Sequence, residues 1–151
     1  FVSAGTYTRL IQNDGTIWMS DTPDEIRDHW PIFNNGAGVV LLHGLGLGVT
    51  LQALLRKDTV YHVTVIEIEQ AVIDLVEPHY RERFPGRSFE IIHADALTWQ
   101  PPKGVQYNAV WHDIWPDLSM ANLPEMHRLH RRYGRRSHWR ASWGRAYLEA
   151  R

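Results

Sequence analysis

The feature that most constrains the fold is a glycine-rich turn between a buried strand and a helix. Residues Val39–Leu42 form a continuous apolar run, as expected for a strand covered on both faces. Gly44, Gly46 and Gly48 follow at alternate positions, and apolar residues then recur at helical spacing over residues 49–57. This order places free backbone N–H groups and the positive end of a helix beside the carboxyl edge of a sheet. It predicts a turn on which a ligand lies against the main chain, where a Cβ would not fit.

The same alternation of strand and helix continues along the chain. Buried-type strands are predicted at Tyr61–Ile68, Phe89–His93 and Gln106–Trp111, with a helix from about Gln70 to Arg83. Strands alternating with helices predict right-handed βαβ units. We therefore predict an α/β fold with a Rossmann-like parallel sheet and helices on both faces.

Two flanking segments complete one predicted domain over residues 1–151, since 151 residues leave little room for a second core. Residues 1–35 predict a β-hairpin around Asn13–Gly15, then a helix whose start is marked by Thr22–Glu25. Residues 122–151 predict a basic helical tail, with three rings four residues apart on one face: Trp139, Trp143 and Tyr147.

The aromatic residues of the tail allow two interpretations, a stripe that packs against the sheet or a second subunit, and a platform for stacked bases. No strand is predicted after Trp115, so the C-terminal part of the sheet is expected to be shortened. The terminal helices or another copy of the chain would then cover the exposed sheet edge, which makes a homo-oligomer a possible partner.

Charge and composition narrow the partners and the compartment. The net charge is −1, yet residues 128–151 hold eight arginines against Glu149 alone, either as a solvated face or as a patch for an anionic partner. Nucleic acid is a possible but disfavoured partner, because the rest of the chain is acidic and no Asn/Asp-Pro-Pro-Tyr motif occurs. Without cysteine there can be no disulfide, and no apolar run could span a membrane, so we expect a cytoplasmic protein without membrane contact.

Two acidic residues stand where parallel strands end. Glu67 lies 19 residues after Gly48 and could accept hydrogen bonds from both hydroxyls of a ribose, with Glu69 as the second choice. Asp95 could accept a hydrogen bond from an exocyclic amino group such as adenine N6. The alternatives are a surface carboxylate for Glu67 and a helix cap or turn for Asp95. Val49 occupies the place of the last glycine of the dinucleotide pattern GxGxxG, which weakens a pyrophosphate assignment.

The spaced segments VVLLHGLGLG, VTVIEIE, IIHADAL and YNAVWHDIWPD resemble the class I S-adenosylmethionine-dependent methyltransferase family over Val39–Asp117. The resemblance implies S-adenosylmethionine as cofactor and a methyl transfer to a small-molecule substrate. It places the turn of Gly44, Gly46 and Gly48 beside the methionine part of the cofactor. The remaining cofactor-binding positions that it implies are Glu67 for the ribose, Asp95 and Ala96 for the adenine, Ile68, and Asp113 facing the sulfonium and substrate.

Within this superfamily the sequence is most similar to the spermidine synthases, through Asp14–Gly15, Asp24–Glu25 and Val65–Glu69. It departs from them in three places: Trp18 stands near the position of their glutamine, Asp28–His29 replaces their tyrosine, and the loop aspartates are four apart instead of three. Aminopropyl transfer and a catalytically silent nucleotide-binding or scaffold module are therefore kept as alternatives to methyl transfer.

Asp113 and His112 are the candidate general bases, and strand alternation puts at most one of them in the cleft; we favour Asp113. Asp21 and Asp117 could meet the cofactor's ammonium or a cationic substrate. The nine histidines are scattered, and the nearest group lies among arginines that would repel a cation, so no metal site is predicted.

Overall fold

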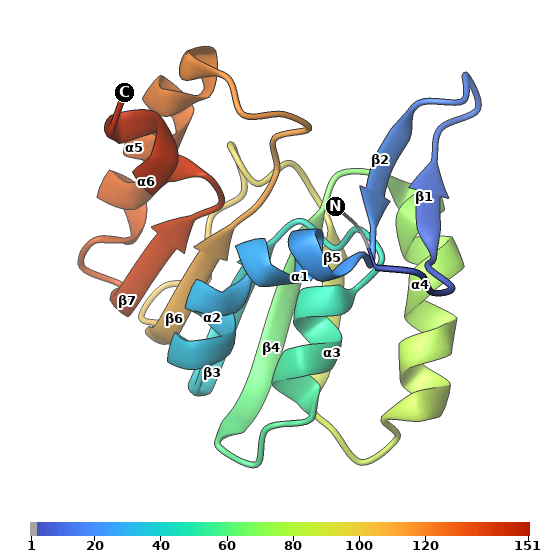
Figure 1. Ribbon diagram of the computed structural model, residues 1–151. Coiled ribbons are helices and arrows are strands. Elements are labelled where there is room, and N and C mark those ends of the chain that lie inside the picture. The colour runs from blue at the N-terminus through green and yellow to red at the C-terminus, as the bar shows by residue number, and fades with distance from the viewer. Residues whose placement is uncertain (1–2) are drawn as a thin grey trace.

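The computed structural model describes residues 3–151 and confirms a parallel α/β fold with an N-terminal hairpin (Figure 1). Five parallel strands form the main sheet in the order β5-β4-β3-β6-β7. Their bounds are β3 Gly38–His43, β4 Val60–Glu67, β5 Phe89–His93, β6 Tyr107–His112 and β7 Ser137–Ser142. The predicted strands and helices of residues 39–111 are confirmed to within a few residues.

Helices cover both faces of the sheet because the central strands are apolar on both sides. One face packs against three helices, α2 (Trp30–Asn35), α3 (Val49–Leu55) and α4 (Gln70–Arg83). The other face packs against α5 (Leu123–Tyr133) and α6 (Arg145–Glu149). A short 3₁₀ helix, Met120–Asn122, leads into α5. Alternation along β3 shows the division, since Val40 and Leu42 belong to the first core and Leu41 to the second.

The hairpin pairs β1 (Arg9–Ile11) with β2 (Ile17–Ser20) in antiparallel fashion, around a turn in which Gly15 has a φ of 87°. Helix α1 (Pro23–Asp28) follows, as predicted. The Thr22 side chain makes no capping bond to it. Instead, the Glu25 carboxylate accepts bonds from the N–H and hydroxyl of Ser20, at 2.7 and 2.6 Å, which fix the helix against the end of β2.

The prediction of a helical tail is wrong at Ser137–Ser142, because this segment forms strand β7 beside β6. Residues four apart share a face in a strand as well as in a helix, so the aromatic spacing did not distinguish the two. Trp139 lies in the strand and stacks on Trp111 at a ring distance of 6.4 Å, while Trp143 follows the strand and Tyr147 lies in α6 with 53% exposure. The sheet therefore has one more strand than predicted, with β7 at its edge. Within residues 3–151, no helix combines the length and apolar character needed to cross a bilayer.

Candidate functional site

A cavity of about 500 Å³ lies at the carboxyl ends of β3, β4, β5 and β6, and it gathers most of the residues that the sequence singled out. Its lining includes Gly44, Gly46, Glu67, Ile68, Asp95, Ala96 and Asp113. Two candidates, Gly48 and His112, lie outside the lining. The volume is in the range of small-molecule sites.

Close contacts within the protein itself require glycine at two positions of the glycine turn. Gly44 has a φ of 97°, and a Cβ there would lie 2.1 Å from the backbone oxygen of Asp113. Gly48 begins α3 with a φ of 79°, and a Cβ there would lie 2.3 Å from a ring carbon of Tyr80. Gly44 is thus required for the close approach of two loops at the cavity. Gly48 is required by Tyr80, not by contact with the cavity.

Glu67 connects the end of β4 to this turn. Its Oε2 accepts a hydrogen bond from the Leu45 N–H at 2.7 Å, and its Oε1 accepts one from the Glu69 N–H at 3.1 Å. The side chain lies on the cavity wall, although the residue is only 8% exposed. A carboxylate has about four acceptor sites, so two remain for ligand hydroxyls. Ile68 and Glu69 are exposed and line the same wall.

Asp95 makes the turn that the sequence offered as its alternative role, and it also lines the cavity. Its Oδ1 accepts a hydrogen bond from the Leu97 N–H at 2.8 Å. The adjacent Ala96 is 4% exposed. Arg132 of α5 donates to the carbonyls of Ala96 and Leu97 at 3.2 and 2.7 Å, which fixes the loop from outside. The sequence placed this arginine among possible phosphate contacts and did not indicate its role at the loop, because the bonds join residues that are 35 or more positions apart.

The N-terminal hairpin covers the cavity and supplies residues that the sequence analysis missed. Leu10, Gln12, Trp18 and Met19 belong to the lining. The Met19 sulfur accepts a hydrogen bond from a backbone N–H of the glycine turn at 3.4 Å. The hairpin and the glycine turn are therefore in contact with each other where they border the cavity. The only sequence signal for this contact was the resemblance to proteins with a similar hairpin.

Asp113 is held by a histidine that the sequence analysis did not select. His29 Nε2 lies 2.7 Å from Asp113 Oδ2, and His29 Nδ1 lies 2.8 Å from the Glu25 carbonyl oxygen. A carbonyl only accepts, so Nδ1 carries a proton, and the second proton of the pair lies between Nε2 and the carboxylate. Burial lowers the pKa of His29, but the hydrogen bond and charge of Asp113 raise it above its ordinary value. Among residues 3–151, Asp113 Oδ1 has no hydrogen-bond partner, so it is free to meet a ligand.

His112 does not suit the predicted role of general base. It is fully buried, and its Nδ1 lies 2.8 Å from Nδ1 of His43 on the face of the sheet that α5 covers. Burial, with the charges of His43, His130 and nearby arginines, lowers the pKa of His112 well below its ordinary value. Asp21 and Asp117 also lie outside the cavity lining. In the part of the chain that the structure describes, no three His, Asp or Glu side chains come together as a metal site.

The cavity is acidic. Five carboxylates line it, and the lining contains no Lys, Arg or His: the acidic residues are Glu67, Glu69, Asp95, Asp113 and Glu125. Glu125 accepts a hydrogen bond from the Trp115 indole N–H at 2.8 Å and keeps its charge, whereas the charge of Asp113 is offset by His29 when that ring is protonated. Such a surface attracts cations and disfavours ligands with an uncompensated carboxylate.

The stability of the His29–Asp113 pair should depend on pH. Because the pKa of His29 is raised in the folded state, its charge stabilises the fold fully below about pH 6.5, and this contribution is lost as pH rises through the folded pKa. We expect His29→Gln to lower the free energy of unfolding by about 1–3 kcal/mol at pH 6, and by less at pH 9. Urea unfolding at both pH values measures the difference. His138→Gln, an exposed control, should show no such trend; a pH-independent loss in His29→Gln would contradict the charged pair.

No protein-family model matches the chain. The polyamine aminopropyltransferase 1 of Streptomyces coelicolor is 31% identical over 129 residues, which cover 79% of this chain and 24% of that protein. The polyamine aminopropyltransferase of Synechococcus sp. (strain JA-3-3Ab) is 30% identical over 130 residues, which cover 76% of this chain and 40% of that protein. The chain thus spans 24% and 40% of the length of these two curated relatives.

The crystal structure of the methyltransferase domain of bacterial CtHen1 superposes with a TM-score of 0.53 at 16% identity, over 70% of this chain and 58% of that chain. At this identity the match concerns the fold alone. Together, the matches confirm the resemblance that the motifs indicated, in fold to the class I methyltransferases and in sequence to the spermidine synthase-like branch.

Proposed function

Because the chain has the class I fold of S-adenosylmethionine-dependent methyltransferases and resembles the polyamine aminopropyltransferases in sequence, we propose that it is a transferase that uses an adenosyl sulfonium donor. The acceptor that the cavity favours is a small amine. The observation that carries this proposal is the acidic lining, in which five carboxylates face one cavity without a basic side chain.

The residues of the cavity fit the parts of such a donor. Glu67 keeps acceptor sites for the ribose hydroxyls, and the Asp95–Ala96 corner suits the adenine through one carboxylate oxygen and the backbone. Asp113 follows β6, and so lies across the glycine turn from Glu67, which ends β4; it would lie near the sulfonium. When bound, the donor supplies a carbon activated for displacement by its positively charged sulfur.

Between the two donors of this class, the acidic lining favours the decarboxylated one. Decarboxylated S-adenosylmethionine carries a sulfonium and an ammonium and no carboxylate, so every charge on it is attracted by the lining. The intact cofactor would bring its carboxylate among five others. The sequence relatives are named as aminopropyltransferases, which supports the same choice.

In the proposed reaction the acceptor nitrogen forms a bond to the donor carbon beside sulfur. The carbon–sulfur bond breaks, its electron pair stays on sulfur, and the nitrogen must lose one proton. In this proposal Asp113 Oδ1 accepts that proton, and the hydrogen bond between His29 Nε2 and Oδ2 supports the assignment because it fixes the carboxylate. Alignment of the two reactants in the cavity would supply much of the rate enhancement.

Calorimetry with both donors tests the proposal. We expect the decarboxylated donor to bind at least about tenfold more tightly than S-adenosylmethionine, since one like-charge contact is avoided. Product analysis with a pool of diamines and polyamines would then identify the acceptor. Tight binding of either donor without turnover of any amine would instead favour the silent nucleotide-binding module, and binding of neither would reject the proposal.

Methyl transfer to a small molecule is the second candidate. Within residues 3–151 the Gly46 N–H has no hydrogen-bond partner, and Gly46 lines the cavity, so this amide could receive the carboxylate of intact S-adenosylmethionine. Tighter binding of the intact donor, with methyl transfer to an acceptor, would favour this candidate over aminopropyl transfer.

A further inference from the structure

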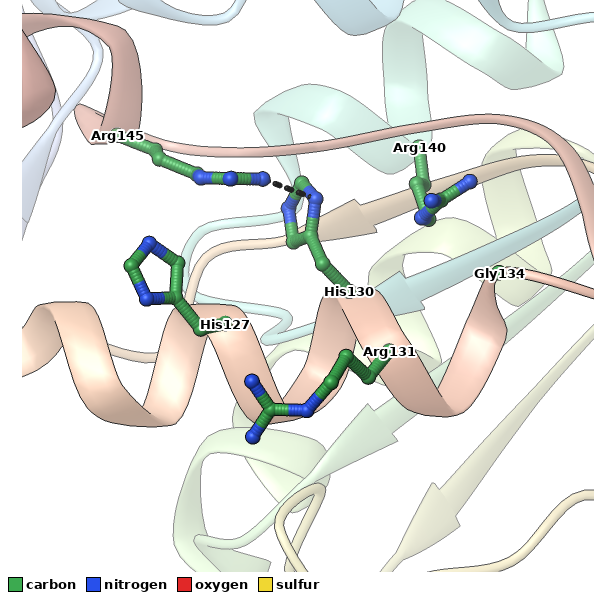
Figure 2. Close-up of a pocket in the computed structure, with 6 residues that line it drawn as sticks. All are labelled: His127, His130, Arg131, Gly134, Arg140 and Arg145. Atoms are coloured by element: carbon green, nitrogen blue, oxygen red, sulfur yellow. Dashed lines mark hydrogen bonds between the residues drawn. The ribbon is translucent and has the colours of Figure 1, made fainter.

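A second pocket, of about 280 Å³, lies between α5, β7 and α6, on the face of the sheet that these two helices cover. Its lining is made of basic residues and one glycine: His127, His130, Arg131, Gly134, Arg140 and Arg145 (Figure 2). None of these residues lines the acidic cavity. The pocket is therefore separate from the site of the proposed function, and its role can be tested independently.

Positive charge in this pocket exceeds the negative charge around it. Within the described chain, Glu149 is the one carboxylate bonded to the lining, and it accepts from Arg145 at 2.9 Å and contacts His127 at 3.0 Å. Arg131 and Arg140 have no acidic partner among residues 3–151. Three arginines against one carboxylate leave a surplus of two positive charges. The carbonyl end of α5 offers about half a negative charge, which cannot balance them.

One side chain of the pocket, Arg140, carries a hydrogen-bond donor that the protein leaves unused. Arg140 Nε is buried and has no hydrogen-bond partner within residues 3–151. His130 Nδ1 accepts from Arg145, because an arginine can only donate, and His130 Nε2 therefore donates to the Ser142 hydroxyl at 2.9 Å. Figure 2 shows Arg145 and Arg140 approaching His130 from opposite sides. A buried charged donor without a partner, as at Arg140 Nε, indicates a missing acceptor.

We propose that this basic pocket binds a phosphate group, with Arg131, Arg140 and Arg145 as its ligands. A phosphate or diphosphate carries two or more negative charges and several acceptor oxygens, which match the charge surplus and the free arginine donors. A single carboxylate would neutralise only half of the surplus. The phosphate could belong to a free phosphate compound or to a nucleic acid backbone, and the size of the pocket favours the former.

Inorganic diphosphate is the probe that tests this site, by calorimetry and by NMR titration of the histidine ring protons at low salt. Burial, then the charges of Arg145 and Arg140, lower the pKa of His130 to about 4, with Glu149 opposing and His127 adding to this effect. Bound diphosphate should offset the arginine charges, so the pKa of His130 should rise toward its ordinary value of 6.5. Saturable binding without this rise would place the anion elsewhere and overturn the proposal.

Two exposed arginines of α5 provide a matched pair of variants. Arg131 lines the pocket and Arg128 does not, and both substitutions remove one charge from the same helix. We expect Arg131→Gln to weaken diphosphate binding about tenfold or more and Arg128→Gln to weaken it about twofold or less. Equal losses in the two variants would indicate a diffuse basic surface and overturn the pocket.

A single-stranded RNA oligonucleotide and acetate complete the test. Diphosphate binding with weaker binding of RNA per phosphate, and none of acetate, would support a pocket for a free phosphate compound. RNA binding without diphosphate binding would overturn it in favour of a nucleic-acid surface. Absence of all binding at low salt would also overturn it, whatever the donor measurements at the acidic cavity give.

Discussion

Replacing Glu67 with alanine is expected to lower donor affinity about hundredfold and also to destabilise the fold. The carboxylate is expected to accept two ribose hydroxyls, and the loss of two charge-assisted bonds at ~1.5 kcal/mol each gives this factor. The same carboxylate accepts the N–H groups of Leu45 and Glu69 in the absence of ligand. Leaving these two backbone N–H groups without a hydrogen-bond partner should lower the free energy of unfolding by roughly 2–4 kcal/mol. Calorimetry with the donor and urea unfolding measure the two effects.

Glu69→Ala is the control for this variant. Glu69 lines the same cavity, and its substitution removes the same charge. It is exposed, however, and its side chain makes no hydrogen bond within residues 3–151. We expect a loss of donor affinity of about fivefold or less, and unchanged stability. If the two variants lost affinity equally, net charge would be the cause and the ribose role of Glu67 would be wrong.

Much of the fold could be predicted because its signals are local. The apolar runs of β3 and β4 and the glycines between Gly44 and Gly48 specify strand, turn and helix within a few residues of each other. The end of each parallel strand then has a fixed place at one sheet edge, so Glu67, Asp95 and Asp113 could be expected to meet. Strand β7 was missed because the spacing of Trp139 and Trp143 suits either periodicity.

The parts of the site that could not be predicted depend on contacts between distant segments. His29 and Asp113 are 84 residues apart, and no local pattern relates them. The hydrogen bonds that Glu67 accepts from the backbone N–H groups of Leu45 and Glu69 were likewise not visible in the sequence. The basic tail was visible as a charge surplus, yet only the fold distinguishes Arg131 and Arg140 in the pocket from Arg132, which holds the Ala96–Leu97 backbone.

Gly44→Ala is expected to lower the free energy of unfolding by roughly 2–5 kcal/mol, the sum of backbone strain and overpacking. The new methyl group would lie 2.1 Å from the Asp113 backbone oxygen, and the φ of 97° is unfavourable for alanine. A backbone atom cannot move aside as a side chain can, so β6 and the turn after β3 would have to separate. This would displace Asp113 from the proposed position of the acceptor, so the rate of the proposed transfer should fall even where the protein remains folded.

Gly104→Ala separates strain from the clash. Gly104 has a similar φ of 82°, but a Cβ there would meet nothing within 4 Å. Its substitution should therefore cost only the left-handed backbone term, about 1–2 kcal/mol, and leave donor binding unchanged. Thermal unfolding of both variants gives the comparison. If the two variants differed by less than about 1 kcal/mol in free energy of unfolding, the two loops would separate easily. The fold would then not hold the carboxylate of Asp113 at a fixed distance from the glycine turn. The position of the proposed proton acceptor would depend on the bound ligand instead.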